Sequence, residues 1–189
     1  RSGVELLLSD RHPNEAAMAR VAALGDPRLR YRPEPVDAME GGGDLEGVRT
    51  MSGALHHFTP EAISALLGGV IARRAPICFF DIAASPAIRR APLVLAPLLA
   101  SVNMAVLFVG SLLLVPLLRP LRPSRLALTY LLPLIPALVA WDGTVSALRA
   151  YTPEELLAIA RAAPGGDSYE WESGAEGPAL YLVGRPAQH

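Results

Sequence analysis

The feature that most constrains this chain is a long uncharged stretch in its second half. Ala91 to Leu118 is a run of 28 residues without a charged side chain. A helix that crosses roughly 30 Å of hydrocarbon needs about 20 apolar residues, so this run is long enough to span a membrane. A second uncharged run, Leu126 to Trp141, has 16 residues and contains Pro133 and Pro136, which kink or break helices. It is too short to predict a second span.

The charges beside the first run bear on its orientation. Arg119, Arg122 and Arg125 follow it, and two further arginines precede it. A single crossing would therefore place positive charge on both sides of the membrane, against the positive-inside tendency. We predict a hydrophobic helical insert at 91–141 that re-enters a membrane surface or lies along it, with its arginines among the headgroups of one leaflet. The alternative is a helical subdomain buried within the protein or in a dimer interface.

Composition limits the remaining classes. Apolar residues make up 51% of the chain and charged residues 19%, which excludes a disordered chain. The net charge of −1 argues against a nucleic-acid partner held by bulk charge. The single Cys78 cannot form an internal disulfide and is typical of a small buried side chain. We therefore expect the chain on the cytoplasmic side of a membrane, with its oligomeric state left open.

The sequence on either side of the insert alternates between strand and helix patterns. Residues 4–8 and 77–82 are mostly apolar runs, which we interpret as buried strands. Further strands are predicted at residues 29–32 and 48–52. Helices are predicted to begin at Pro13, after Thr59 and at the Thr152-Pro153-Glu154-Glu155 capping box. Residues 168–172 and 180–183 are predicted to form a final antiparallel pair. The order predicts an α/β fold in which 1–90 and 142–189 form one domain, interrupted by the insert at 91–141.

Three strand-end segments resemble those of class I S-adenosylmethionine-dependent methyltransferases. They are Asp10 after the first strand, Asp37-Ala38 after the second, and Ala54-Leu55-His56-His57-Phe58 after the third. A closing helix and β-hairpin complete that family's layout. The resemblance implies a doubly wound, mostly parallel Rossmann-like sheet, with these loops facing one crevice at the carboxyl ends of the strands.

The resemblance also implies a cofactor site for S-adenosylmethionine. Asp10 would accept hydrogen bonds from the ribose hydroxyls, because a carboxylate offers two acceptor oxygens. Asp37 would meet the adenine amino group with Ala38 beside the ring, and Ala54 and Leu55 would border the methionine end. The alternatives are that Asp10 caps the following helix and that Asp37 only forms a turn.

His56 and His57 are the candidate catalytic residues. Either one is titratable near neutral pH and suits a general base, if the acceptor must lose a proton before methyl transfer. Structural packing of both imidazoles is the alternative. A zinc site is not expected, because adjacent residues rarely bind one ion together and no Cys or acid lies at ligand spacing.

The polar segment 141–151 is a candidate substrate-side lid. It offers Asp142, Arg149 and Tyr151 between the insert and the closing helix. The alternative is a structural ion pair between Asp142 and Arg149, with Asp142-Gly143 as a turn.

The family's first strand and its glycine-rich loop have no counterpart before Asp10. We therefore expect the chain to be the carboxy-terminal part of a longer protein, or a degenerate relative, and to bind the cofactor weakly by itself. The predicted function is S-adenosylmethionine-dependent methyl transfer to a small hydrophobic acceptor. The alternatives are a non-catalytic methyltransferase-like scaffold and a small membrane-associated interaction protein.

Overall fold

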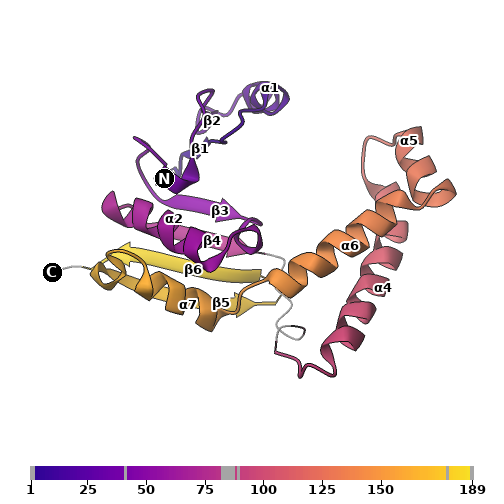
Figure 1. Ribbon diagram of the computed structural model, residues 1–189. Coiled ribbons are helices and arrows are strands. Elements are labelled where there is room, and N and C mark those ends of the chain that lie inside the picture. The colour runs from indigo at the N-terminus through magenta and orange to yellow at the C-terminus, as the bar shows by residue number, and fades with distance from the viewer. Residues whose placement is uncertain (1–2, 41, 82–87, 89, 178, 188–189) are drawn as a thin grey trace.

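The computed structural model describes residues 3–40, 42–81, 88, 90–177 and 179–187. Figure 1 shows two parts, an α/β body and a helical hairpin that extends away from it. The predicted order of strands and helices on either side of the hydrophobic insert is confirmed. Ile82, the last residue of a predicted strand, lies outside the described residues.

The body begins with a small parallel unit. Strand β1 (Leu6–Leu8) pairs with β2 (Leu29–Tyr31), and helix α1 (Glu15–Leu24) connects them. The Asn14 side chain caps α1 by accepting from the Ala17 N–H. The sequence predicts that this helix begins at Pro13. In the structure Pro13 instead precedes the helix.

The prediction that residues 4–8 form a buried strand is wrong. Val4 is 85% exposed, Leu6 47% and Leu7 42%. Among the described strands β1 pairs only with β2, so it lies at an edge and its side chains stay in contact with water.

The other strands form a separate mixed sheet. It contains β3 (Arg49–Ser52), β4 (Ile77–Asp81), β6 (Ala179–Pro186) and β5 (Tyr169–Glu176), in that spatial order. β3 and β4 are parallel, whereas β4–β6 and β6–β5 are antiparallel. The α/β class and the closing antiparallel pair are thus confirmed. A single, mostly parallel sheet is not what forms, because the described strands pair as two sheets.

Helices cover one face of the four-stranded sheet. Helix α2 (Pro60–Ala72) contacts α7 (Pro153–Ala162), and both contribute to the core. Alternation along β4 shows the result: Phe79 is 2% exposed, but its neighbour Phe80 on the other face is 41% exposed. This one-sided covering differs from the predicted doubly wound arrangement, in which helices cover both faces.

The body helices begin at strong caps. Thr59 accepts from the Ala62 N–H at the start of α2. At α7 the predicted capping box is present, because Thr152 accepts from the Glu155 N–H and the Glu155 carboxylate accepts from the Thr152 N–H. The leucines that these helices bury, such as Leu67 and Leu156, are fully inaccessible, and each such burial contributes about 1.5–3 kcal/mol.

The insert folds into the helical hairpin. Helix α4 (Ala96–Leu114) continues into a short 3-10 turn η3 (Val115–Leu117). The tip contains α5 (Pro123–Leu126) and a π-helical turn η4 (Ala127–Leu131), and α6 (Leu134–Arg149) returns beside α4 to the body. Residues 96–117 are long and apolar enough to cross a membrane, with a mean hydropathy of 2.4. The return limb is bent by 76° between Leu131 and Leu134, where the sequence predicts a break at Pro133.

Helix α6 continues beyond the boundary placed at Trp141. The alternative of a turn at Asp142-Gly143 is therefore wrong, since both residues lie inside the helix. Gly143 has a packing role instead: a Cβ there would lie 2.6 Å from the Leu107 Cδ1, so glycine lets α6 approach α4 closely.

Candidate functional site

A cavity of about 530 Å³ lies where the carboxyl ends of β1 and β3 meet the loop after β2. Four of the five predicted cofactor residues line it: Asp10, Asp37, Ala38 and Ala54. The remaining lining residues come from the loops after β1, β2 and β3, from β3 and β4, and from α2; they are Ser9, Arg11, Val36, Met39, Gly42, Leu45, Arg49, Thr50, Met51, Ser52, Phe58, Leu66, Val70 and Phe79. The fifth predicted residue, Leu55, is fully buried in the core and does not line the cavity.

The two acidic residues of the cavity each stabilise their own loop. One Asp10 carboxylate oxygen accepts from the His12 N–H at 2.8 Å, and the Asp10 carbonyl accepts from the Val36 N–H at 2.9 Å. One Asp37 carboxylate oxygen accepts from the Met39 N–H at 2.9 Å. Asp10 therefore does not cap α1, whereas Asp37 does form the turn considered as an alternative. A carboxylate has further acceptor sites, so the turns leave both side chains able to accept from a ligand.

Two arginines supply positive charge at the same cavity. Arg11 Nε lies 3.6 Å from the second carboxylate oxygen of Asp37. Arg49 donates to the Leu45 carbonyl. Partial burial, and secondly the nearby Arg73, lower the pKa of Arg49. The cavity thus combines two carboxylates and two guanidinium groups with an apolar lining from methionine and phenylalanine.

His56 belongs to a buried polar pair. In the chain it lies between Ala54 and Phe58, which line the cavity, but His56, His57 and Asp81 do not line it. His56 lies in the 3-10 turn η2 (Leu55–His57), directly after Ala54, and its side chain is 9% exposed. The Asp81 carboxylate, at the end of β4 and 1% exposed, accepts from the His56 backbone N–H at 2.9 Å. Its two oxygens also lie 3.0 Å from the His56 Nδ1.

This geometry determines which tautomer a neutral His56 imidazole adopts. A carboxylate acts only as an acceptor, so the contact holds the proton of neutral His56 on Nδ1. The Nε2 lone pair is then available to accept a proton, and no described residue hydrogen-bonds to that atom. An imidazole oriented in this way by a buried acid is the arrangement of a general base.

His57 has a different environment. Its side chain is exposed, and its ring centroid lies 4.1 Å from that of His56 at an angle of 45°. No described acid holds His57, so the structure distinguishes two histidines that the sequence treated as equivalent candidates.

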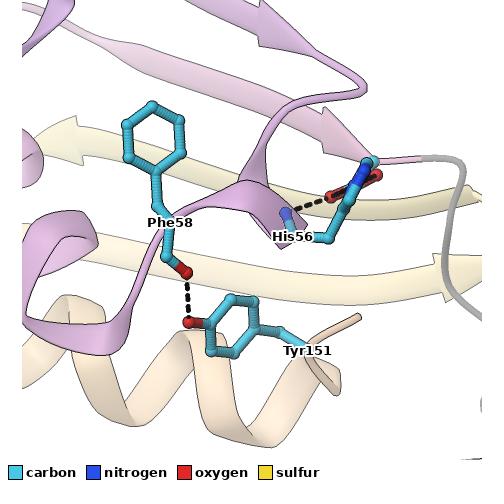
Figure 2. Close-up of polar contacts among 4 residues, drawn as sticks. His56, Phe58 and Tyr151 are labelled. Atoms are coloured by element: carbon cyan, nitrogen blue, oxygen red, sulfur yellow. Dashed lines mark hydrogen bonds and ion pairs between the residues drawn. The ribbon is translucent and has the colours of Figure 1, made fainter. Parts of the chain in front are cut away.

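The three predicted substrate residues are not brought together. Asp142 and Arg149 are exposed on α6, and no ion pair between them occurs among the described residues. Tyr151 follows α6 and donates from its hydroxyl to the Phe58 carbonyl at 2.7 Å (Figure 2). Because Phe58 lines the cavity, Tyr151 connects the base of the hairpin to the loop that carries His56.

Asp81 is the important residue that the sequence analysis missed. The signal was present, because Asp81 is an acid near the end of an apolar strand, as Asp10 is. The predicted strand continued to Ile82, which hid the fact that Asp81 ends β4 at the same edge as His56. Counting strand-end acids on each strand would have found it.

The structure gives little support for a metal site or a cysteine nucleophile among the described residues. Within residues 3–40, 42–81, 88, 90–177 and 179–187, no three metal-ligating side chains are grouped. Burial raises the pKa of the Cys78 thiol, which makes it a poor nucleophile.

Comparison with known proteins gives little further information. No known protein family matches the sequence, and no curated protein matches it. A solved structure, an O-methyltransferase family protein from Burkholderia thailandensis, is similar with a TM-score of 0.45 and 12% identity. The alignment covers 92% of this chain and 40% of that protein. A likeness this weak does not carry the function, which rests on the residues above.

Proposed function

We propose that this chain carries part of an S-adenosylmethionine-dependent methyltransferase site, acting on a hydroxyl group of a small hydrophobic acceptor. The observation that carries the proposal is the His56–Asp81 pair in the segment whose residues Ala54 and Phe58 line the same cavity as Asp10 and Asp37. A general base alone fits many reactions, and a cavity with two acidic loops alone fits many nucleosides. Their combination favours transfer from a nucleoside cofactor to an acceptor that must lose a proton.

The residues of the cavity fit such a cofactor. Its volume of about 530 Å³ lies within the range of sites for small organic ligands. Asp10 would accept from the ribose hydroxyls, Asp37 from the adenine amino group, and Ala38 and Ala54 leave space beside the ring and the methionine end. When bound, the cofactor supplies a methyl group already activated by the sulfonium, so the protein's main contribution is alignment.

The acceptor class follows from His56. A hydroxyl is a poor nucleophile until its proton is removed. In this proposal Nε2 of His56 would take that proton, and Asp81 would stabilise the resulting imidazolium. A neutral amine attacks through its own lone pair and has less need of a base. The apolar lining from Met39, Met51 and Phe58 favours a hydrophobic acceptor.

Binding is tested by titrating the chain with S-adenosylhomocysteine and following backbone amide shifts by NMR. We expect weak binding, with the largest shifts at the loops of Asp10 and Asp37. Asp10→Ala should lower the affinity at least tenfold, since it removes a charged acceptor. Asp26→Ala is the control, because Asp26 pairs with Arg28 outside the cavity. Equal affinity of Asp10→Ala and the parent would contradict the site.

Catalysis is tested by methyl transfer to a panel of small phenols and alcohols. His56→Ala and Asp81→Asn should each lower the rate by about 10²–10⁴-fold, whereas His57→Ala should change it little. Cofactor binding without any transfer would favour the non-catalytic scaffold instead.

A further inference from the structure

The helical hairpin (residues 91–149) exposes apolar side chains over much of its surface. Leu113 and Leu114 are consecutive in α4, so they point about 100° apart, yet they are 67% and 61% exposed. Val106 on the same helix is 63% exposed, and Leu138 on α6 is 66% exposed. Only 11% of the apolar span in residues 96–117 is buried. A partner protein covering one face would leave the rest in water, whereas lipid surrounds such a surface.

Several polar side chains of the hairpin are turned inward and hydrogen-bonded. Asn103 Nδ2 donates to Thr144 Oγ1 at 3.1 Å, which joins α4 to α6. Ser111 donates to the Leu107 carbonyl and Thr129 to the Arg125 carbonyl, and both hydroxyls are buried. An interior that holds the polar groups and a surface that is apolar is the arrangement required in hydrocarbon, where no water can satisfy a polar group.

The charges of the hairpin have one sign at its tip. Arg119, Arg122 and Arg125 lie between the two limbs, and the sequence contains no Asp or Glu from residue 82 to 141. Arginines without acidic neighbours complement anionic lipid headgroups, with which guanidinium groups form strong hydrogen bonds.

The position of Asp142 bears on the orientation of the hairpin in a bilayer. The close approach of Gly143 to Leu107 places Asp142, which is exposed, beside the middle of the apolar span in residues 96–117. A perpendicular crossing would therefore hold an exposed carboxylate near the bilayer midplane, which is costly. Exposed Trp141 next to it is typical of the membrane–water interface.

We propose that the hairpin is a membrane-binding element that lies along one leaflet of an anionic bilayer, at the boundary of headgroups and acyl chains. Arg119, Arg122 and Arg125 contact lipid phosphates, the leucines of α4 enter the acyl region, and Asp142 stays at headgroup level. This proposal rests on the hairpin alone and is independent of the chemistry at His56.

The first test is flotation of the chain with vesicles of phosphatidylcholine, with or without phosphatidylglycerol. The chain should float with the anionic vesicles, and more weakly with the neutral ones. The variant R119Q/R122Q/R125Q should lower partitioning to anionic vesicles by about a hundredfold. The variant R20Q/R161Q/R185Q has the same change in net charge within the body and should partition like the parent.

The apolar contribution is tested at matched exposed leucines. Leu113→Gln should lower partitioning about tenfold, because it removes an apolar side chain from the acyl region. Leu24→Gln should not, although Leu24 in α1 is 68% exposed and Leu113 67%. Failure to float with either vesicle type would overturn the proposal. So would a stable dimer in buffer that does not float, which would assign the apolar surface to a second copy.

Orientation is tested with a cysteine at the tip, Leu121→Cys in a Cys78→Ser background, added to sealed vesicles from outside. A membrane-impermeant thiol reagent should label this cysteine, because the tip stays in the outer leaflet. If the cysteine were protected in sealed vesicles and labelled only after the vesicles were opened, the hairpin would cross the bilayer. That result would overturn the interfacial arrangement.

Discussion

Leu67 in α2 and Leu113 in α4 are the same residue type in two apolar helices, yet Leu67 is fully buried and Leu113 is 67% exposed. In the hairpin, Ser111, Thr129 and Thr144 are buried while leucines such as Leu113 and Leu138 are exposed. In the body, leucines such as Leu67 and Leu156 form the core. The buried leucines of the body suit water, and the exposed leucines of the hairpin are what the proposed contact with lipid requires.

The helix ends differ in the same way. In the body, α1, α2 and α7 each begin at a side-chain cap from Asn14, Thr59 or Thr152. In the hairpin, α4, α5 and α6 begin without any side-chain hydrogen bond at the cap. Capping stabilises a helix end against water, so its absence indicates that the hairpin helices depend on packing and surroundings rather than on local signals.

The largest expected difference between the body and the hairpin is in the stability lost when a leucine of each is shortened to alanine. Leu67→Ala should lower the free energy of unfolding by about 2–5 kcal/mol, because it leaves a cavity in the core. Leu113→Ala should change it by no more than about 0.5 kcal/mol in lipid-free buffer. Urea unfolding followed by circular dichroism measures both, and equal losses would show that α4 is buried in the free protein.

A second prediction concerns the polar groups inside each region. Asp81→Ala should lower the free energy of unfolding by about 1–3 kcal/mol, because it leaves the His56 N–H and Nδ1 without their acceptor. Asn103→Leu should lower the free energy of unfolding by less than about 1 kcal/mol, because it removes one neutral hydrogen bond. The Thr144 hydroxyl can still donate to a carbonyl of its own helix. Thermal unfolding of both variants makes the comparison, and the reverse order would contradict it.

A third prediction uses the caps. Thr152→Ala should destabilise the protein by about 1 kcal/mol, because the Glu155 N–H loses its acceptor. Ser124→Ala near the start of α5 should have almost no effect, because no side chain caps that helix. Urea unfolding is again the measurement, and a loss at Ser124 equal to that at Thr152 would contradict the contrast.

The smallest expected effect is a pH dependence where the hairpin joins the body. The pKa of Glu154 is lowered by hydrogen bonds from its own backbone N–H and from Thr152, and then by Arg90. A lowered folded-state pKa contributes stability that is present above the unfolded pKa and is lost as pH falls through the folded one. The stability difference between the parent and Glu154→Gln should therefore be visible at pH 7 and vanish in acid. If the stability difference between the two proteins stayed the same from pH 7 to a pH below the usual carboxyl pKa, the charge of Glu154 would not be its cause.

Local signals predicted the body well. Thr152 and Glu155 at capping-box spacing predicted the start of α7, and Thr59 predicted the start of α2. The predicted strand segments also agree with the strands among the described residues to within a few residues. These features depend on neighbours in the chain, so they can be read without knowledge of the fold.

Long-range pairing could not be predicted in this way. The segment of residues 4–8 is apolar enough for a buried strand, but its burial depends on which strands pair beside it. The contact of His56 with Asp81 spans 25 residues and needs the β3–β4 register, and the one-sided covering of the sheet needs the placement of α2 and α7. The proximity of Asp10 and Asp37 was predictable because both follow parallel strands; the roles of all the site residues remain predictions.

Because of the hydrogen bond from Tyr151 to Phe58, insertions at the base of the hairpin should disturb the protein more than insertions at its tip. One residue inserted between Arg149 and Tyr151 would turn the tyrosine by about 100° if the helix lengthened, and would remove its hydroxyl from the Phe58 carbonyl. The same insertion between Leu118 and Leu121, at the far end, leaves that junction untouched. An engineer who replaced this hairpin with another would therefore be free at the tip and bound to the native spacing at the base.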